Sequence, residues 1–446
     1  MTPETIIITG AACRFAGTPN ADLFWRNTLA NEPLLSARPA PRELLDKAAA
    51  AGVPWLCPPR ATGLLEGLYN YDPGAFDAPP DAAPDALFAA QLALEALRDA
   101  GLSTRSLDPG RTGVHIGCAT PFTPALEAAL QHLHLVDQTV ALARNLVPRA
   151  GETQLAALGR HLRAALPPFT QSAVRDAHPH ALAATTASLL GFAGPARVAC
   201  DGHAAFFGAL QMALDDLRGG RADAALVGAV SPPFTAASLL AACALQETTR
   251  HDVPHALCKS ADGMAPGEGG AFFVLQRATP GFSPVATPYA EAGAVSLLFA
   301  PGPNTVARVM EAALRAAGAE PCHVGYVEAN GSGVPREDAA ELEAMSALFD
   351  PASPAAIGTG KPMFGHTLAA SGAAGFLRAA LALRHRILPP SVVTGKPHPR
   401  LAQSRALYVP AEPRPWVSGA AQRFAGATAM DPSGVCGHAL LRECKP

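Results

Sequence analysis

The stretch that most constrains the fold is residues 194–219, a short apolar run followed by a turn and a helix that is apolar on nearly every face. A surface helix would carry a polar face, so this pattern predicts a helix buried in the centre of the molecule. We expect Asp201 to cap the helix, Gly202 to allow the turn, and His203 to lie where unpaired backbone N–H groups and the positive dipole end converge. Such N–H groups can bind a developing oxyanion, so this elbow is the first candidate site.

Apolar runs alternate with helical stretches along the whole chain, which predicts an α/β fold with mainly parallel strands. We expect two halves of similar topology, residues 1–277 and 278–446, each with one nearly all-apolar helix; the second such helix is predicted at 367–384. The Pro-rich segment 31–80 is expected at the surface, and residues 120–185 are expected to be helical.

Composition narrows the class of protein. The 446 residues are 49% hydrophobic and carry a net charge of −3, which allows a large core and gives no bias toward nucleic acid or a membrane surface. Nine unpatterned cysteines favour reduced thiols in the cytoplasm over disulfides or a zinc site. No run is long enough to span a membrane, and the N-terminus is expected to be the first strand. Five histidines are predicted on solvated helix faces without a metal: His132, His134, His161, His178 and His180.

Five stretches together resemble the beta-ketoacyl synthases (ketosynthases) of polyketide and fatty-acid biosynthesis. In chain order they are ITGAACRFAGTPNADLFW, ADGMAPGEGGAFFVL (261–275), YVEANGSGVPREDAAE (326–341), GTGKPMFGHTLAASGAAG (358–375) and AGATAMDPSGVCGHALL (425–441). The resemblance implies a thiolase-like fold with five layers, αβαβα. It also implies no cofactor of the protein's own, because the family's substrates are carried on the phosphopantetheine of an acyl carrier protein.

The resemblance assigns residues to the family's site, and several differ from it. His203 takes the place of the acyl-accepting cysteine, and an acyl-imidazole hydrolyses readily. Asn330 replaces the first catalytic histidine; an asparagine can donate a hydrogen bond but cannot move a proton near neutral pH. Lys361 and His366 match the family's lysine and second histidine. Cys200, three residues before His203, is expected to be a small buried cysteine that faces away from the acyl pocket.

Two further motifs depart from the family. Pro432 lies where the family supplies a backbone N–H to the oxyanion hole, and the loss of one such donor typically costs on the order of 100-fold in rate. Ser332 keeps a hydroxyl where the family contacts the pantetheine arm, whereas Val334 lacks the second one. Asp338 and Glu341 are expected to be structural, holding this loop and the start of the next helix.

Three functions remain open at this point. The first is a non-condensing partner of an active ketosynthase, similar to a chain-length factor; it would form a heterodimer or homodimer, use residues 120–185 as part of the contact, and act as a discrete protein with an acyl carrier protein. The second is decarboxylation of malonyl-acyl carrier protein to supply an acetyl unit, using His366, Asn330 and His203. The third is an atypical acyl transfer or hydrolysis by His203 with Asp201 or His366. A fourth alternative, a decayed relic without activity, has about as much support from the sequence as the third.

Overall fold

The computed structural model describes residues 5–36, 59–65, 76, 78, 82–119, 124–166, 169–176, 178–231, 239, 243, 248–279, 281–300, 304–418 and 422–444. Its centre is an 11-stranded sheet with the order β10-β8-β7-β12-β13-β6-β1-β5-β4-β2-β3. The strands of the N-terminal half are β1 (Thr5–Phe15), β2 (Thr112–Gly117), β3 (Ala196–Ala199), β4 (Ala224–Ser231) and β5 (Gly269–Ala278). Those of the C-terminal half are β6 (Ala290–Phe299), β7 (Val324–Glu328), β8 (Ala355–Gly358), β10 (Leu407–Tyr408), β12 (Phe424–Met430) and β13 (Val435–Arg442).

The two halves repeat one strand order. The first half reads β3-β2-β4-β5-β1 and the second β8-β7-β12-β13-β6, each with two parallel pairings followed by two antiparallel ones. Two residue pairs, Ile7 with Glu291 and Ile8 with Ala290, join β1 to β6. The predicted repetition of topology is therefore confirmed, but the expectation of mainly parallel strands is wrong. The tight turn between β12 and β13 shows why, because strands joined by so short a connection must run antiparallel.

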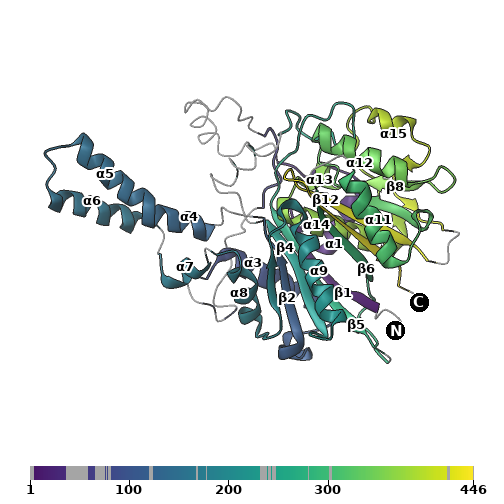
Figure 1. Cartoon of the computed structure of the whole chain (residues 1–446), viewed down its shortest axis with the longest axis horizontal. Coiled ribbons are helices and arrows are strands. Elements are labelled where there is room, and N and C mark those ends of the chain that lie inside the picture. Colours follow the sequence, from purple (N-terminus) through teal and green to yellow (C-terminus); the bar gives the residue numbers. More distant parts are fainter. Residues whose placement is uncertain are drawn as a thin grey trace.

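Two buried helices lie between the two five-stranded groups (Figure 1). Helix α9 (Ala205–Arg218) packs on β2 and β4, helix α14 (Ser371–His385) packs on β12 and β7, and the two helices contact each other. Phe376 of α14 lies 5.2 Å from the ring of Phe206 and 5.0 Å from that of Phe273. A Cβ on Gly437 of β13 would lie 2.5 Å from Phe207, so only glycine lets this strand approach α9.

The outer faces of the sheet are covered by further helices. Helices α3 (Pro84–Asp99) and α8 (Ala181–Leu190) cover the N-terminal half, whereas α11 (Thr305–Ala317), with α12 (Pro335–Leu348) packed on it, covers the C-terminal half. The predicted five-layer αβαβα arrangement is thus confirmed. The shorter elements are α1 (Ala21–Ala30), α13 (Lys361–Phe364), α15 (Pro399–Gln403) and a small sheet of β9 (Ile387–Leu388) with β11 (Arg414–Pro415).

A helical hairpin projects from the body beside α3 and α8 (Figure 1). It comprises α4 (Pro124–Leu130), a π-helical turn (Gln131–Leu135), α5 (Val136–Leu146) and α6 (Glu152–Ala165), and α7 (Gln171–Asp176) leads back to the body. The helical prediction for 120–185 is confirmed over the described part. The solvated position predicted for His132 is wrong, because its ring is buried and stacks on Phe169 at 5.1 Å.

Two other expectations need correction. Most of the segment 31–80 lies outside the described residues, but Ala61 and Thr62 are buried rather than at the surface, since Thr62 pairs with Ser36 and the adjoining Gly63 with Gly267. Cys200 is exposed, not buried, because it follows the edge strand β3. Within the described part of the chain, we find no helix with the length and apolar character needed to cross a bilayer.

Candidate functional site

The elbow before α9 has the predicted shape but a different cap. A 3-10 turn (Gly202–Ala204) leads into α9, and Gly202 has a φ of 57°, which explains the glycine. Asp201 makes no side-chain cap, so that prediction is wrong; its backbone angles, φ −97° and ψ 38°, are not those of an extended N-cap residue. The cap comes instead from Asp431, whose Oδ2 accepts the backbone N–H of His203 at 2.9 Å. Asp431 follows His203 by 228 residues.

Asp431 is held in this position by its own turn between β12 and β13. Its Oδ1 accepts the Ser433 backbone N–H at 2.9 Å and the Ser433 hydroxyl at 2.5 Å. A Cβ on Gly202 would lie 2.1 Å from Oδ2, so the carboxylate fits against the elbow only because residue 202 is glycine. Burial opposes ionisation of Asp431, but His203 and the hydrogen bonds from Ser433 and His203 outweigh it and lower the pKa. An ionised carboxylate therefore occupies the anion-binding position at the start of the central helix.

Two imidazoles meet at this elbow. The rings of His203 and His366 have centroids 4.8 Å apart and planes inclined by 60°. Burial lowers the pKa of His203 to about 4, with Asp431 opposing and Lys361 adding to the shift. Burial, Lys361 and His203 lower the pKa of His366 well below its ordinary value. Both imidazoles are therefore neutral near neutral pH.

His366 retains an unused hydrogen-bond donor. Its Nδ1 accepts the backbone N–H of Leu368 at 3.2 Å and lies 3.1 Å from the Ser371 hydroxyl. An Nδ1 that accepts a backbone N–H places the ring proton on Nε2. Nε2 is buried and has no hydrogen-bond partner among the described residues. The loop that leads into α14 thus offers one ring N–H, on the imidazole that lies beside the ring of His203.

Both polar atoms of the side chain of Asn330, the third member of the predicted site, are bound by neighbouring groups. Its Oδ1 accepts hydrogen bonds from Lys361 Nζ and the Met430 backbone N–H, both at 3.2 Å. Its Nδ2 donates to Glu337 Oε2 at 3.3 Å. Two donors on one side and a carboxylate on the other fix the orientation of the amide. The motif places Asn330 next to Lys361, but the Asn330 Nδ2 group already donates to the Glu337 carboxylate.

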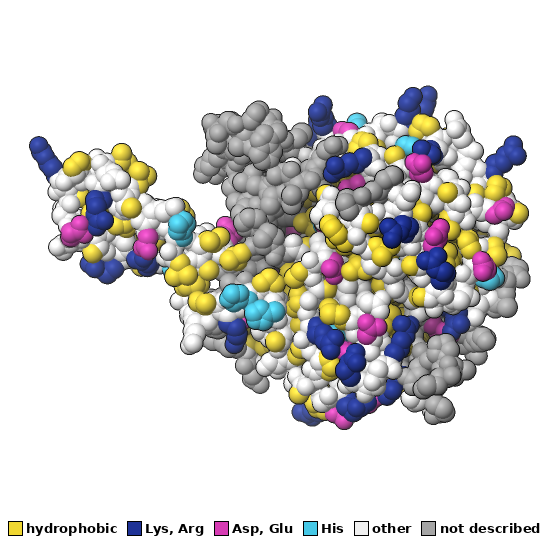
Figure 2. Space-filling model, viewed as in Figure 1, with side chains coloured by type: hydrophobic (Ala, Val, Ile, Leu, Met, Phe, Trp, Pro, Cys, Tyr) yellow, Lys and Arg dark blue, Asp and Glu magenta, His cyan; other side chains and the backbone are white. Residues whose placement is uncertain are grey.

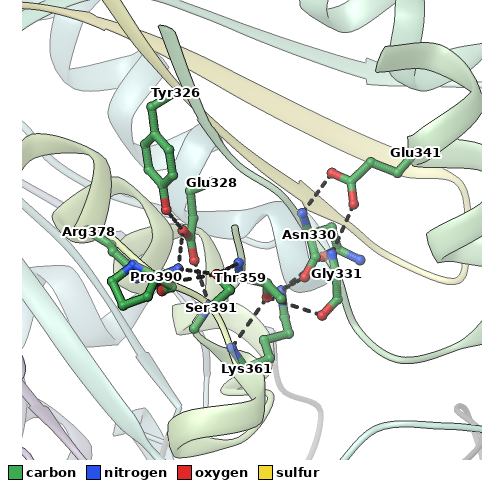
Figure 3. Close-up of polar contacts among 11 residues, drawn as sticks. Tyr326, Glu328, Asn330, Gly331, Glu341, Thr359, Lys361, Arg378, Pro390 and Ser391 are labelled. Atoms are coloured by element: carbon green, nitrogen blue, oxygen red, sulfur yellow. Dashed lines mark hydrogen bonds and ion pairs between the residues drawn. The ribbon is translucent and has the colours of Figure 1, made fainter. Parts of the chain in front are cut away.

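Lys361 lies beneath this amide and is surrounded by acidic side chains. It also donates to the Asn330 carbonyl (Figure 3). Glu341 accepts the backbone N–H groups of Asn330 and Gly331 at 2.7 and 2.9 Å. Burial raises the pKa of Glu341 to about 7 and lowers that of Lys361, while their charges act on each other in the opposite sense. Lys361 therefore compensates buried negative charge and orients Asn330.

The neighbouring carboxylates hold the loop, as expected from the sequence. Asp338 accepts the backbone N–H of Leu257 at 2.7 Å and that of Gly333 at 3.2 Å. Glu328 pairs with Arg378 at 2.6 Å and accepts the Gly360 N–H at 2.7 Å; Figure 3 shows the Glu328–Arg378 pair. These contacts fix the two loops that carry Asn330 and Lys361.

Sequence reasoning overlooked two carboxylates at this site. Ser332, the proposed pantetheine contact, is buried and donates to Glu337 at 2.7 Å. Glu337 and Asp431 both line an open pocket beside the β12–β13 turn. Two signals in the sequence could have indicated these carboxylates. Glu337 lies next to Asp338, and Asp431 lies next to Pro432. Their role requires the three-dimensional structure, because their partners are distant in sequence. Across the described residues, no three His, Cys, Asp or Glu side chains are placed to hold a metal ion.

Comparisons with known proteins agree with this architecture. Residues 3–280 match the family model "Beta-ketoacyl synthase, N-terminal domain", and residues 289–394 match "Beta-ketoacyl synthase, C-terminal domain". Mycoketide-CoA synthase of Mycobacterium tuberculosis is 29% identical over 98% of this chain, and 5-methyl-1-naphthoate synthase of Streptomyces sahachiroi is 34% identical over 57% of it. The matched parts make up only 10% and 15% of those two proteins.

A solved structure with the same fold is the ketosynthase from module 6 of the bacillaene synthase of Bacillus subtilis. Its TM-score is 0.80 at 23% sequence identity, over 99% of this chain and 73% of that one. The oxazolomycin ketosynthase domain OzmH KS7 of Streptomyces albus gives the same TM-score at 20% identity, over 99% of this chain and 76% of that one. These likenesses support the thiolase-like fold.

Proposed function

Because this chain belongs to the beta-ketoacyl synthase family, we propose that it is a non-condensing member that pairs with an active ketosynthase, as chain-length factors do. The observation that carries the proposal is the Asp431 carboxylate on the His203 N–H. A condensing enzyme needs that N–H free for the oxyanion of the acyl-transfer intermediate. A built-in anion competes with that oxyanion and repels it.

The other changes act in the same direction. His203 gives an acyl group no stable thioester, and Pro432 has no N–H to offer as the second oxyanion donor. The architecture around them, with two buried helices and hydrogen-bonded loops that carry Asn330 and Lys361, suits a subunit that shapes a partner's acyl tunnel. We propose an acyl carrier protein as the further partner, with the substrate on its phosphopantetheine and no other cofactor.

Co-expression with the ketosynthases encoded in the neighbouring genes tests this function. We expect one of them to co-purify with the chain and to make its product only in the complex. Replacing His203→Ala in this chain should leave condensation by the complex unchanged, whereas replacing the partner's nucleophile should abolish it. A stable homodimer that binds no ketosynthase in any pairing would contradict the proposal.

Decarboxylation of malonyl-acyl carrier protein is a second candidate, and it rests on His366. In this reaction the bond from the α-carbon to the carboxylate breaks, CO₂ leaves, and the enolate takes up a proton to become acetyl. The buried Nε2–H of His366 has no partner in the described part, and in this proposal it donates to the enolate oxygen. The orientation of Asn330 toward Glu337 removes the second donor and speaks against high activity.

Mass spectrometry of malonyl-acyl carrier protein incubated with the chain decides this second function. The expected sign is loss of CO₂ that His366→Ala abolishes, and an unchanged rate in that variant would exclude the site. A hydrolase or transferase that uses His203 has less support, since the nearby Asp431 carboxylate, which accepts the His203 backbone N–H, would repel the oxyanion of such a reaction.

A further inference from the structure

Two buried aspartates line one small cavity where the helical hairpin joins the body. Asp85 lies in the first turn of α3, and Asp176 ends α7. Their exposed fractions are 8% and 9%. The cavity has a volume of about 20 Å³ and is also lined by Cys118, directly after β2, and Thr185 of α8. Space of this size holds about one water molecule, so it excludes a ligand of several heavy atoms.

The remaining lining of the cavity is apolar on the inside and polar toward the solvent. Ala86, Ala181 and Leu182 supply apolar walls. His178 lines the outer side, is exposed, and stacks on His180 at 5.5 Å between ring centroids. Figure 2 shows histidine side chains on the surface where the hairpin meets the body. The cavity therefore lies next to the surface, within reach of small ions from the solvent.

Each of the two carboxylates has an oxygen without a partner. Asp85 Oδ1 and Asp176 Oδ2 are buried, and neither takes part in a hydrogen bond within the part of the chain that the structure describes. Asp176 Oδ1, in contrast, accepts hydrogen bonds from Arg175 Nε at 2.9 Å and from the Thr185 hydroxyl at 3.4 Å. A buried carboxylate oxygen without a partner costs free energy. Two such oxygens on residues that line one cavity point to an occupant that binds both.

The charges around the cavity determine the charge of this occupant. Asp176 is paired with Arg175, so these two side chains together are neutral. Asp85 has no basic partner among the described residues, and burial raises its pKa to about 7. Its position in the first turn of α3 favours the ionised form, because the helix dipole is positive there. One positive charge in the cavity would therefore balance the one carboxylate that is left.

We propose that this cavity binds one monovalent cation of about the size of a water molecule, K⁺ or ammonium, through the carboxylates of Asp85 and Asp176. Oxygen atoms are the ligands that hard cations prefer. A divalent metal fits less well. Zn²⁺ needs at least three protein ligands, and no three His, Cys, Asp or Glu side chains of the described ranges are placed to supply them. Mg²⁺ keeps several water molecules, for which the cavity is too small.

The ion connects parts of the chain that are distant in sequence. Asp85 belongs to a helix that covers the sheet, whereas Asp176 belongs to the segment that leads from the hairpin back to the body (Figure 1). A cation between them stabilises the root of the hairpin. Neither aspartate belongs to the site of His203 and His366, so this inference stands independently of the proposed function.

Thermal unfolding of the full chain in three chloride salts of equal ionic strength tests the inference. KCl or ammonium chloride, at about 100 times the dissociation constant, should raise the midpoint by about 3 °C over tetramethylammonium chloride, whose cation is too large for the cavity. Asp85→Asn and Asp176→Asn should each remove this difference. The matched control is Asp22→Asn, which changes an exposed aspartate in the first turn of α1 and should keep the whole difference.

A direct measurement remains informative if either cavity variant fails to fold. Calorimetric titration of KCl into the wild-type chain, dialysed against tetramethylammonium chloride, should give one binding site, and prior addition of ammonium chloride should weaken the apparent affinity for K⁺. If the cavity holds only water, or if Asp85 is simply protonated, the wild-type midpoint will be the same in all three salts and the titration will show no binding. That result, or a difference between salts that persists in both cavity variants, would overturn the inference.

Discussion

The starts of α9 and α14 occupy equivalent places in the two halves, yet their chemistry has diverged. At α9, the His203 N–H is taken by the Asp431 carboxylate. At α14, His366 keeps a buried Nε2 with no partner in the described part, and Ser371 and Leu368 hold the ring. The protein's own Asp431 carboxylate occupies the anion site at α9, whereas the site at α14 retains the His366 Nε2–H as a donor. The difference agrees with our proposal that this chain has lost acyl transfer, because the resemblance assigns acyl transfer and enolate stabilisation to separate sites.

The largest change in stability is expected from replacing Lys361, the buried lysine near the start of α14. Lys361→Met removes the ammonium group next to Asn330 and Glu341 and leaves buried carboxylates uncompensated. We expect the free energy of unfolding to fall by about 3–5 kcal/mol, measured by urea denaturation. The exposed Lys396→Met is the control and should change it by less than about 0.5 kcal/mol. Equal effects of the two variants would show that Lys361 does not compensate this cluster.

The free energy of unfolding should depend on pH through His203, by about 3 kcal/mol relative to a variant with a non-titrating side chain at this position. Its pKa is about 4 in the folded chain, against 6.5 for an ordinary histidine, so between these values only the unfolded chain takes up the proton. The stability of the wild type, relative to His203→Gln, should therefore fall by about 3 kcal/mol as the pH drops from about 6.5 to about 4.

Urea denaturation at several pH values measures this difference. His366→Gln should give a change of the same sign, because the pKa of His366 is also depressed by burial. A stability difference that does not depend on pH would mean that the His203 ring is solvated or charged, and the comparison of the two helix starts would need revision.

A smaller effect is expected from the cap itself. Asp431→Ala leaves the His203 N–H without its charged acceptor, and we expect a loss of about 2 kcal/mol in thermal or urea unfolding. Ser371→Ala at the start of α14 removes a neutral contact to His366 and should cost about 1 kcal/mol. If Asp431→Ala were neutral or stabilising, the carboxylate would not be a cap of α9.

The sequence predicted the helices and turns that carry this site more fully than the side-chain contacts within it. The elbow at Gly202 and His203, the second apolar helix and the repeated halves follow from hydrophobic patterning and turn chemistry, which are local. The match of Lys361 and His366 came from motifs. Asp431 could be read only as a substitution in a loop, since its partner lies 228 residues away.

Other errors have the same physical origin. Asp201 has the residue type of a cap, but its backbone is not extended, so a distant side chain took that role. The direction of the Asn330 amide depends on Met430 and Glu337, which approach it only in the folded chain. Strand direction at β12 and β13 depends on a short turn that helix and strand periodicity does not reveal.

The central claim, that Asp431 fills the acyl-transfer anion site, can be tested by the reactivity of a thiol introduced as His203→Cys. A thiolate at a helix start is stabilised by free N–H groups and destabilised by an adjacent carboxylate. We predict that alkylation of this thiol, followed by peptide mass spectrometry, becomes about tenfold faster when Asp431→Gly is added, because the N–H is then free. Ser433→Ala, which keeps the carboxylate, should change the rate by less than about twofold. Equal rates with and without Asp431 would contradict the account.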